Sequence, residues 1–269
     1  MSLAKRFHLL VRVLPFVIGL VLLKAAAHAL GWEFMPLDGL IPSLIAGSIF
    51  LIGFLLTQVL ADYREAEHMP GEIRTALEAI HDDVLNFAAG GARGVDLGEL
   101  RTALARIVEA FATGLGVKGR HCDLADAVAR VDELSPFFMR LQALNLSERY
   151  VVRLKAEQDN LRRCLFRVAY IQKMEFVPSV HVLVQSLVLA SLFVLLFLKT
   201  TGAWESMLIV AFVGYMFLYS LFLIGHLDQP FRQGEGTVDD VSLFQLREFL
   251  EKIEAEGVAE EAKKALAAE

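Results

Sequence analysis

The stretch that decides the fold is Leu40–Leu60, which reads LIPSLIAGSIFLIGFLLTQVL and contains no charged residue. Crossing the hydrocarbon core of a bilayer takes about 20 mostly apolar residues in a helix, and this stretch has 21. Two further stretches, Val177–Leu198 and Met207–Ile224, are similarly apolar. The sequence therefore predicts a helical membrane protein.

A fourth apolar segment, Val13–Leu30, is interrupted by Lys24 and His28. It could be a signal peptide, because Ala25–Ala29 resembles a cleavage site made of small residues. However, Lys24 lies between the apolar core and that site. Removal of the segment would also leave three spans, with the middle section and the C-terminus on opposite sides of the membrane. We therefore interpret Val13–Leu30 as the first of four spans.

Charged residues concentrate in the middle of the chain, where residues 61–176 hold 16 of the 26 lysines and arginines and 18 of the 32 aspartates and glutamates. We therefore predict four parts: the first and second membrane helices in 1–60, a cytoplasmic helical domain in 61–176, the third and fourth membrane helices in 177–226, and a cytoplasmic C-terminal segment in 227–269. The net charge of −6 provides no basic surface for nucleic acid, so that class of partner is not expected.

Lysine and arginine near the ends of spans indicate the cytoplasmic side, because they resist translocation. Lys5 and Arg6 precede the first span. The loop Gly31–Gly39 contains neither residue type, whereas Arg64 and Lys173 flank the middle section. We therefore expect a multi-pass protein of the cell (inner) membrane, with both termini and the middle section in the cytoplasm.

The middle section has the apolar spacing of helices, with apolar residues three and four positions apart. The predicted helices cover Ile73–Leu85, Leu97–Phe111, Leu124–Leu134, Ser147–Phe176 and, in the tail, Val241–Ala268. Ser135-Pro136 predicts a break between two of them. No stretch alternates apolar and polar residues long enough to predict a strand, so the expected fold class is all-α.

A glycine motif at Gly114–Gly119 spells G-x-G-x-x-G, the pattern with which glycines let a backbone approach a pyrophosphate group. In dinucleotide-binding proteins this motif follows a strand and opens a helix. Here a predicted helix precedes it, and no strand–helix–strand unit can be built around it. We therefore interpret the motif as a loop between two helices.

Two histidine-containing clusters could ligate a metal ion, namely His81-Asp82-Asp83 and the set of His121, Cys122, Asp123 and Asp126. Adjacent residues on one helical turn point in different directions, which is unfavourable for a shared ligand. We interpret the first cluster as an exposed turn and the second as a solvated helix start. No set of residues predicts catalysis, a metal site or a cofactor, so the chain is not expected to be an enzyme.

Polar residues inside the first span are costly in a bilayer, so they call for an explanation. Lys24 and His28 lie one helical turn apart. Long side chains near the end of a span can extend to the interface and keep their charged group in water. Alternatively, both residues could line a water-filled vestibule of a pore. The sequence leaves both alternatives open.

The second span has two stripes on different sides of the helix. The first contains small, hydroxyl and aromatic residues, namely Ser43, Gly47, Phe50, Phe54 and Thr57, and the second contains Ile41, Ile45, Ile49 and Ile52. The small residues of Ser43-x-x-x-Gly47 favour close contact with another helix. The isoleucines could face lipid, or they could form an apolar ring if several copies of this helix surround an axis.

Three motifs lie at the ends of the predicted spans. Ile41-Pro42-Ser43 begins the second span, which exits through Ala61–Glu67 (ADYREAE). Leu227–Phe231 (LDQPF) follows the fourth span. These motifs resemble those of bestrophins, in which a hydrophobic neck is followed by a tyrosine, an arginine and an acidic run, and a Pro-Phe-Gly segment ends the membrane domain. The order of spans, cytoplasmic insert and tail is similar over nearly the whole chain, most of all to uncharacterised bacterial bestrophin-like proteins.

The resemblance implies a homo-oligomer, with a pentamer favoured, that passes monovalent ions through an axial pore lined by the second helix. An anion such as chloride is the favoured ion. The resemblance assigns the pore neck to Ile41, Ile45 and Ile49. It also assigns a post-membrane turn to Asp228, Pro230 and Phe231, in which proline ends the helix and the phenylalanine ring anchors the tail.

The chain departs from the family pattern at two places. Glu65 and Ala66 stand where bestrophins have paired aromatic residues. Arg232 and Gln233 separate Phe231 from the acidic residues beyond, whereas a calcium-binding acidic cluster follows directly in the animal proteins. Calcium gating is therefore not implied.

A second hypothesis is a non-conducting membrane scaffold or sensor whose cytoplasmic helices recruit a partner. A membrane-embedded enzyme is a third, without a catalytic constellation to support it. A closed ring of subunits with an axial hole would favour the channel, and a monomer or dimer would favour the scaffold.

Overall fold

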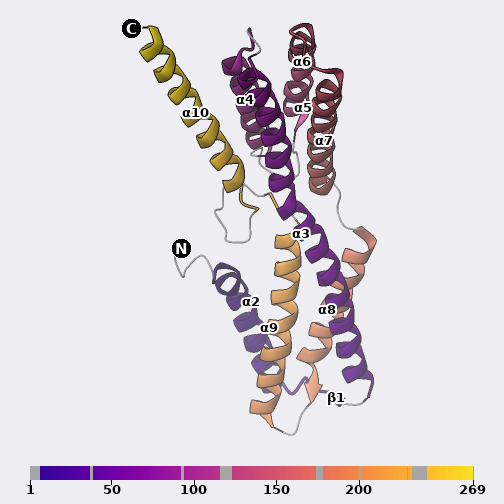
Figure 1. Ribbon diagram of the computed structural model, residues 1–269. Coiled ribbons are helices and arrows are strands. Elements are labelled where there is room, and N and C mark those ends of the chain that lie inside the picture. The colour runs from indigo at the N-terminus through magenta and orange to yellow at the C-terminus, as the bar shows by residue number, and fades with distance from the viewer. Residues whose placement is uncertain are drawn as a thin grey trace. The chain divides into compact units, whose positions relative to one another are not determined.

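The computed structural model describes residues 7–36, 39–91, 94–115, 123–173, 178–199, 202–228, 230–231 and 241–268. Almost all of these residues are helical (Figure 1), which confirms the all-α fold class. The chain divides into two compact units. The boundaries between them fall after Tyr63, after Met174 and in the segment that follows Pro230.

The first unit contains the four helices that are long and apolar enough to cross a membrane, which confirms a multi-pass membrane protein. They are α2 (His8–Ala29), the first part of α3 (Leu40–Ala89), α8 (Pro178–Leu196) and α9 (Ala203–Leu227). Helix α2 packs most extensively against α9, and α8 packs against both. The segment with Lys24 and His28 is therefore a full helix of this bundle.

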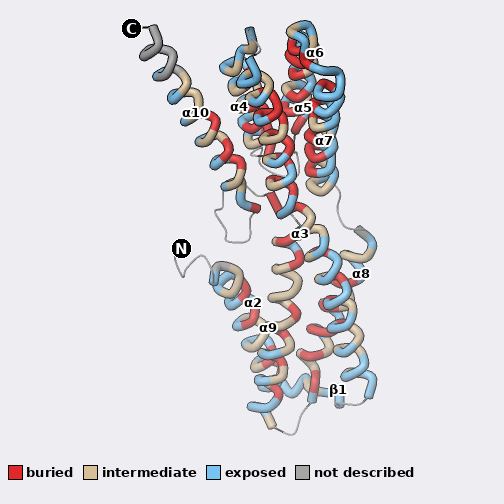
Figure 2. The backbone as a smooth tube through the Cα atoms, viewed as in Figure 1, coloured by how far each residue is buried: buried red, intermediate tan, exposed pale blue. Residues whose placement is uncertain are grey.

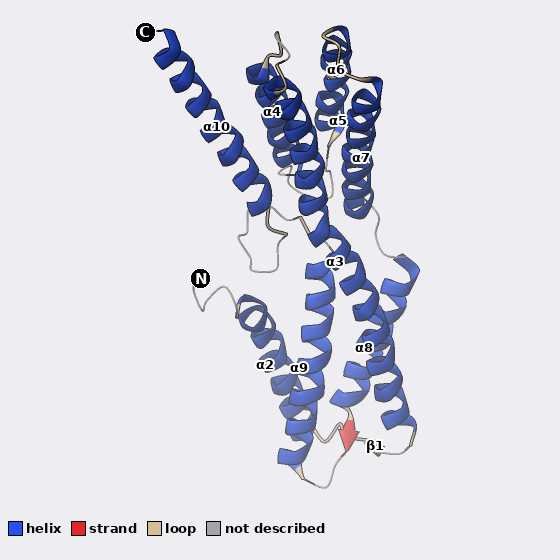
Figure 3. Ribbon diagram, in the orientation of Figure 1, coloured by secondary structure: helices blue, strands red, loops and turns tan. Residues whose placement is uncertain are grey.

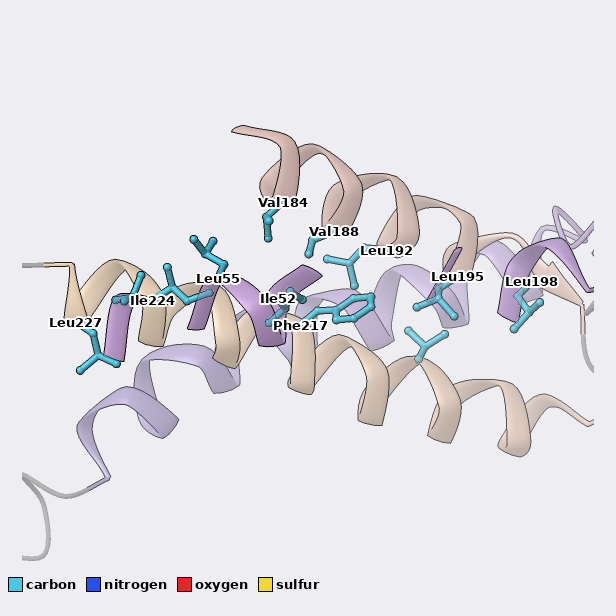
Figure 4. Close-up of a cluster of buried hydrophobic side chains, with 12 residues drawn as sticks. Ile52, Leu55, Val184, Val188, Leu192, Leu195, Leu198, Phe217, Ile224 and Leu227 are labelled. Carbon is cyan, nitrogen blue, oxygen red and sulfur yellow. The ribbon is translucent and has the colours of Figure 1, made fainter. Parts of the chain in front are cut away.

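The core of the first unit is an apolar cluster between α3, α8 and α9. Figure 4 shows Ile52 of α3 and Phe217 of α9 converging in its middle, opposite Val188 and Leu192 of α8. Its other buried members are Leu55, Val59, Val184, Leu195, Leu198, Val210, Ile224 and Leu227. Because lipid is as apolar as these side chains, close packing rather than transfer from water holds such helices together.

Helix α3 is a single helix of 50 residues that belongs to both units. It continues through Pro70, although proline removes one backbone hydrogen bond and usually kinks or ends a helix. Met69 and Ile73 beside it are buried. Their burial on one face of the helix offsets the lost bond, and the second span therefore continues directly into the second unit.

A short parallel pairing joins two loops of the first unit. The strands are β1 (Met35–Pro36) and β2 (Leu198–Lys199), with Met35 opposite Leu198. Figure 3 shows this as the one place where the described residues form strand structure. The pairing was not predicted, because two residues are too few to show an alternating pattern. It fixes the loop after α2 against the end of α8.

In the described residues, the second unit contains the later part of α3 and five further helices: α4 (Leu97–Leu115), α5 (Ala125–Asp132), α6 (Leu134–Ala143), α7 (Glu148–Lys173) and α10 (Phe244–Ala268). Helices α4 to α7 pack against one another, and α10 packs against α4. Buried residues follow the inward faces of these helices (Figure 2). The helices predicted from the apolar spacing are all present, and α6 is an additional one.

Helix α6 was not predicted, because Ser135-Pro136 was interpreted as a break. The break is real but short: α5 ends at Asp132 and α6 begins at Leu134. Proline is tolerated in the first turn of a helix, where its missing N–H has no intrahelical partner. Pro136 therefore marks the start of a helix here.

Gly114 of the glycine motif is explained by packing. A Cβ atom at this position would lie 2.4 Å from the carbonyl oxygen of Asp123. The backbone N–H of Asp123 also donates to the carbonyl oxygen of Gly114 at 3.3 Å. Glycine therefore allows the chain to return past the end of α4, whereas Gly116 and Gly119 lie outside the described residues.

Candidate functional site

The three isoleucines predicted to form a pore neck lie on the membrane part of α3. With 3.6 residues per turn, Ile41, Ile45 and Ile49 fall within an arc of about 80°. Ile41 and Ile45 are half-buried and pack against the core cluster, whereas Ile49 is 43% exposed. Ile52, predicted on the same stripe, is buried in the cluster. The stripe therefore follows the edge of the core, and Ile49 is its most exposed member.

The face of α3 that points away from the core is largely apolar. Phe50 and Phe54 are 73% and 60% exposed. The hydroxyl groups of Ser43 and Thr57 on this face donate to backbone carbonyl oxygens four residues earlier, those of Gly39 and Gly53, at 2.7 and 2.8 Å. This face therefore offers mainly van der Waals contact to whatever covers it.

A polar contact joins α3 to α8 at Ser48, whereas the sequence predicts a close helix contact at Ser43 and Gly47. Ser48 and Ser191 of α8 are both buried, and their Oγ atoms are hydrogen-bonded at 2.8 Å. The predicted contact residue Ser43 is exposed, and a Cβ atom on Gly47 would meet nothing within 4 Å. Within one chain, Ser48 therefore makes the small-residue contact between helices.

A buried charge network lies near the end of α2. The side chain of Lys24 is fully buried, and its ammonium lies 2.7 Å from Oε1 of Glu33. The ammonium also donates to the carbonyl oxygens of Leu196 and Leu198 at 3.2 and 2.5 Å. The ammonium therefore has one ion-pair partner and two hydrogen-bond acceptors. Within the chain, the charge of Lys24 is therefore neutralised by Glu33 rather than left free.

Glu33 connects Lys24 to His28. Its Oε2 lies 3.0 Å from Nδ1 of His28, whose side chain is 44% exposed. Burial raises the pKa of Glu33, but the hydrogen bonds from Lys24 and His28 lower it more, so the pKa lies below its ordinary value of 4.5. The sequence prediction missed Glu33 as the partner. The available signal was an acidic residue in the short loop after a span that contains a lysine.

The predicted post-membrane turn follows α9 directly. The backbone N–H of Asp228 donates to the carbonyl oxygen of Ile224 at 2.9 Å, and α9 ends at Leu227. Pro230 cannot continue the helix, because it lacks an N–H group. Pro230 and Phe231 are both buried, and Phe231 is 4% exposed. The predicted anchoring role of Phe231 requires this burial.

Replacing Phe231 with alanine is expected to lower the free energy of unfolding by about 3–5 kcal/mol, the cost of truncating a buried phenylalanine. Phe244 at the start of α10 is 51% exposed, so Phe244→Ala serves as the matched control with a smaller loss. The melting temperature and the yield of assembled protein in detergent measure both variants. Equal melting temperatures for the two variants would show that Phe231 does not anchor the tail.

The two candidate metal clusters of the sequence do not form such sites in the described residues. His81 and Asp83 are buried within α3, so the predicted exposed turn is wrong. His121 and Cys122 lie outside the described residues. Within the part of the chain that the structure describes, no group of three or more histidine, cysteine, aspartate or glutamate side chains is placed to hold a metal ion.

Comparison with known proteins shows similarity in structure only. No protein-family model matches the chain, and no curated protein matches it. Solved structures of a bacterial bestrophin homologue from Klebsiella pneumoniae do match. One variant of that protein superposes with a TM-score of 0.70 at 15% identity, covering 94% of this chain and 97% of the other. A second has a TM-score of 0.72 at 16% identity, covering 92% and 96%.

These matches extend over both units of the chain and nearly the whole length of the matched proteins. A third variant gives a TM-score of 0.69 over 94% of this chain. At such low identity the likeness concerns the arrangement of the backbone. It confirms a bestrophin-like fold, the architecture that the motifs at the ends of the spans indicated.

Proposed function

We propose that several copies of this chain assemble around an axis and that the membrane part of α3 lines an ion pore along it. The observation that carries this proposal is the bestrophin-like channel fold, which extends over the membrane helices and the cytoplasmic unit together. The number of subunits proposed is five.

The proposed neck consists of Ile41, Ile45 and Ile49 from each subunit. One side of this stripe is supported by the subunit's own core, as the half-burial of Ile41 and Ile45 shows. Ile49 leaves nearly half of its surface free. A narrow ring of such side chains can close a pore by excluding water and can conduct when water fills it. No charged group is needed for this type of gate.

The ions proposed to pass are monovalent, with an anion such as chloride favoured. An apolar neck does not distinguish the sign of an ion by charge, so the reversal potential under a salt gradient decides between anions and cations. We further propose that the protein resides in the inner membrane with both termini in the cytoplasm. His28, with its exposed ring, is the remaining candidate for a polar group in the outer vestibule.

The mass of the purified protein in detergent tests the assembly. The account predicts a particle with five times the chain mass of 29.9 kDa, after subtraction of bound detergent and lipid. A ring of another subunit number would change the stoichiometry but would keep the axial pore. A monomer or dimer, obtained with correctly folded protein, would favour the non-conducting scaffold that recruits a cytoplasmic partner.

A further inference from the structure

The C-terminal helix α10 has a row of buried apolar side chains, through which it packs within the second unit. Leu246, Phe249 and Ile253 are at most 3% exposed and are spaced three and four residues apart, so they share one face of the helix. The next position on this face is Glu256. Glu256 therefore places a carboxylate at a position where the apolar spacing predicts an apolar side chain.

Glu256 faces a histidine that is itself out of contact with solvent. His81 of α3 is 0% exposed, and its Nε2 lies 3.4 Å from Oε2 of Glu256. Neither of these two buried atoms has a hydrogen-bond partner. An unpaired buried polar atom is costly, and here two such atoms lie opposite each other.

The other ring nitrogen of His81 also faces a carboxylate. Nδ1 lies 3.3 Å from Oδ1 of Asp82. A neutral imidazole has one N–H donor and one acceptor, so it leaves one of its nitrogens pointing at a negatively charged oxygen without a proton between them. Only the imidazolium form, which has two N–H donors, can donate to both carboxylates.

Other charged groups surround this contact. Three ion pairs connect α10 to α3 and α4: Arg74 with Glu248 at 2.7 Å, Lys252 with Glu78 at 3.6 Å and Arg101 with Glu260 at 2.8 Å. Lys252 also lies 3.9 Å from Asp82. Among side-chain types in general, histidine is the one whose ordinary charge change falls near neutral pH.

One more titratable group lies close in sequence. Asp83 is buried, and burial raises its pKa, with Arg153 of α7 at 2.9 Å lowering it in part. Its nearest charged partner is therefore on α7, whereas His81 has its Nε2 directed at α10. The contact between His81 and Glu256 is thus a histidine–carboxylate contact between α3 and α10.

We propose that His81 is a proton-operated latch for α10. Protonated His81 donates to Glu256 and holds the middle of α10 against α3, and loss of that proton leaves the two groups unpaired and loosens the helix. Because only the imidazolium can donate to both Glu256 and Asp82, the attachment is expected to strengthen when His81 gains a proton and to weaken when it loses that proton. The cytoplasmic unit would then respond to cytoplasmic pH through its last helix.

Hydrogen exchange of the full-length protein at pH 6 and pH 8 tests the latch, after correction for the intrinsic pH dependence of exchange. In the parent protein, protection of α10 around Ile253 and Glu256 should fall by about tenfold at the higher pH, the factor supplied by one hydrogen bond to a charged group. In His81→Gln the protection should be the same at both pH values. Glu256→Gln, which changes a partly exposed residue, should abolish the pH dependence in the same way.

Two controls separate the latch from general effects. His68→Gln changes an exposed histidine on the same helix and should keep the full pH dependence. Arg101→Gln removes an ion pair to α10 and should lower the protection at both pH values by the same factor. Equal protection at pH 6 and pH 8 in the parent, or an unchanged pH dependence in both His81→Gln and Glu256→Gln, would overturn the proposal.

Discussion

Glu33→Gln is expected to destabilise the chain by about 3–5 kcal/mol, the cost of removing one partner of a buried ion pair. Glutamine keeps the shape of glutamate and one oxygen that can accept a hydrogen bond, so the change removes the negative charge and replaces the other acceptor oxygen with an NH2 donor. Lys24 is fully buried in a helix that crosses the membrane, and it has no other negatively charged partner within the described contacts. Its ammonium would remain out of water without a counter-charge.

A second substitution shows that the loss comes from the unpaired charge. Lys24→Met in the Glu33→Gln background removes the ammonium and should recover most of the lost stability, because an apolar side chain of similar volume fits a buried site. Glu133→Gln breaks an exposed ion pair with Arg130 and should cost at most about 1 kcal/mol. Unfolding of all variants in the same detergent measures the differences. A loss for Glu33→Gln no larger than that for Glu133→Gln would contradict the account.

The ion pair of Lys24 and Glu33 also determines how the stability of the chain changes with pH. The pKa of Glu33 is lowered in the folded chain. Its contribution to stability is therefore fully present above the ordinary pKa of 4.5 and is lost as the pH falls through the lowered value. Between neutral pH and pH 3, the parent should lose more stability than Glu33→Gln does.

The parts of the fold that could be predicted from the sequence are those determined locally. The four spans follow from the length and apolar character of single segments, and the helices of the second unit follow from apolar spacing within a few turns. The predicted ends of the helices were less accurate. Pro136 begins α6, and α3 passes through Pro70, because the effect of a proline depends on where the helix starts and on what its neighbours bury.

The contacts between distant segments could not be predicted. Lys24 is partnered by backbone groups about 170 residues away, which the β1–β2 pairing brings beside the loop that contains Glu33. A single sequence shows the lysine as an isolated charge in an apolar segment. The burial of His81 could not be predicted either, because it contacts Glu256 of α10, which lies at the other end of the chain.

The isoleucine stripe illustrates the limit of helical spacing. Ile41, Ile45, Ile49 and Ile52 are equivalent by pattern, yet Ile52 is in the core and Ile49 is largely outside it. The difference arises because the arc that they cover is wider than the face that α8 and α9 bury. Spacing predicts which residues share a side of the helix, and the neighbouring helices decide which of them remain free.

Replacing Ile49 with alanine is expected to increase ion flux by about tenfold or more, since a reduction of about 1.4 kcal/mol in a barrier is a factor of ten. The change acts in every subunit of the proposed ring at once. It widens the neck and reduces the apolar surface that excludes water, so the barrier to wetting falls. Ile49 is preferred to Ile45 for this test, because Ile45 also packs against the core and its truncation would weaken the subunit.

Ion flux into liposomes that contain equal amounts of assembled protein tests the central claim, that α3 lines an ion pore, most directly. The control is Thr57→Ala, which belongs to the other stripe of α3 and removes a hydroxyl group already bonded within the helix. The account predicts measurable flux for the parent, an equal flux for Thr57→Ala and a clearly higher flux for Ile49→Ala. Flux at the level of protein-free liposomes for all three proteins would contradict it.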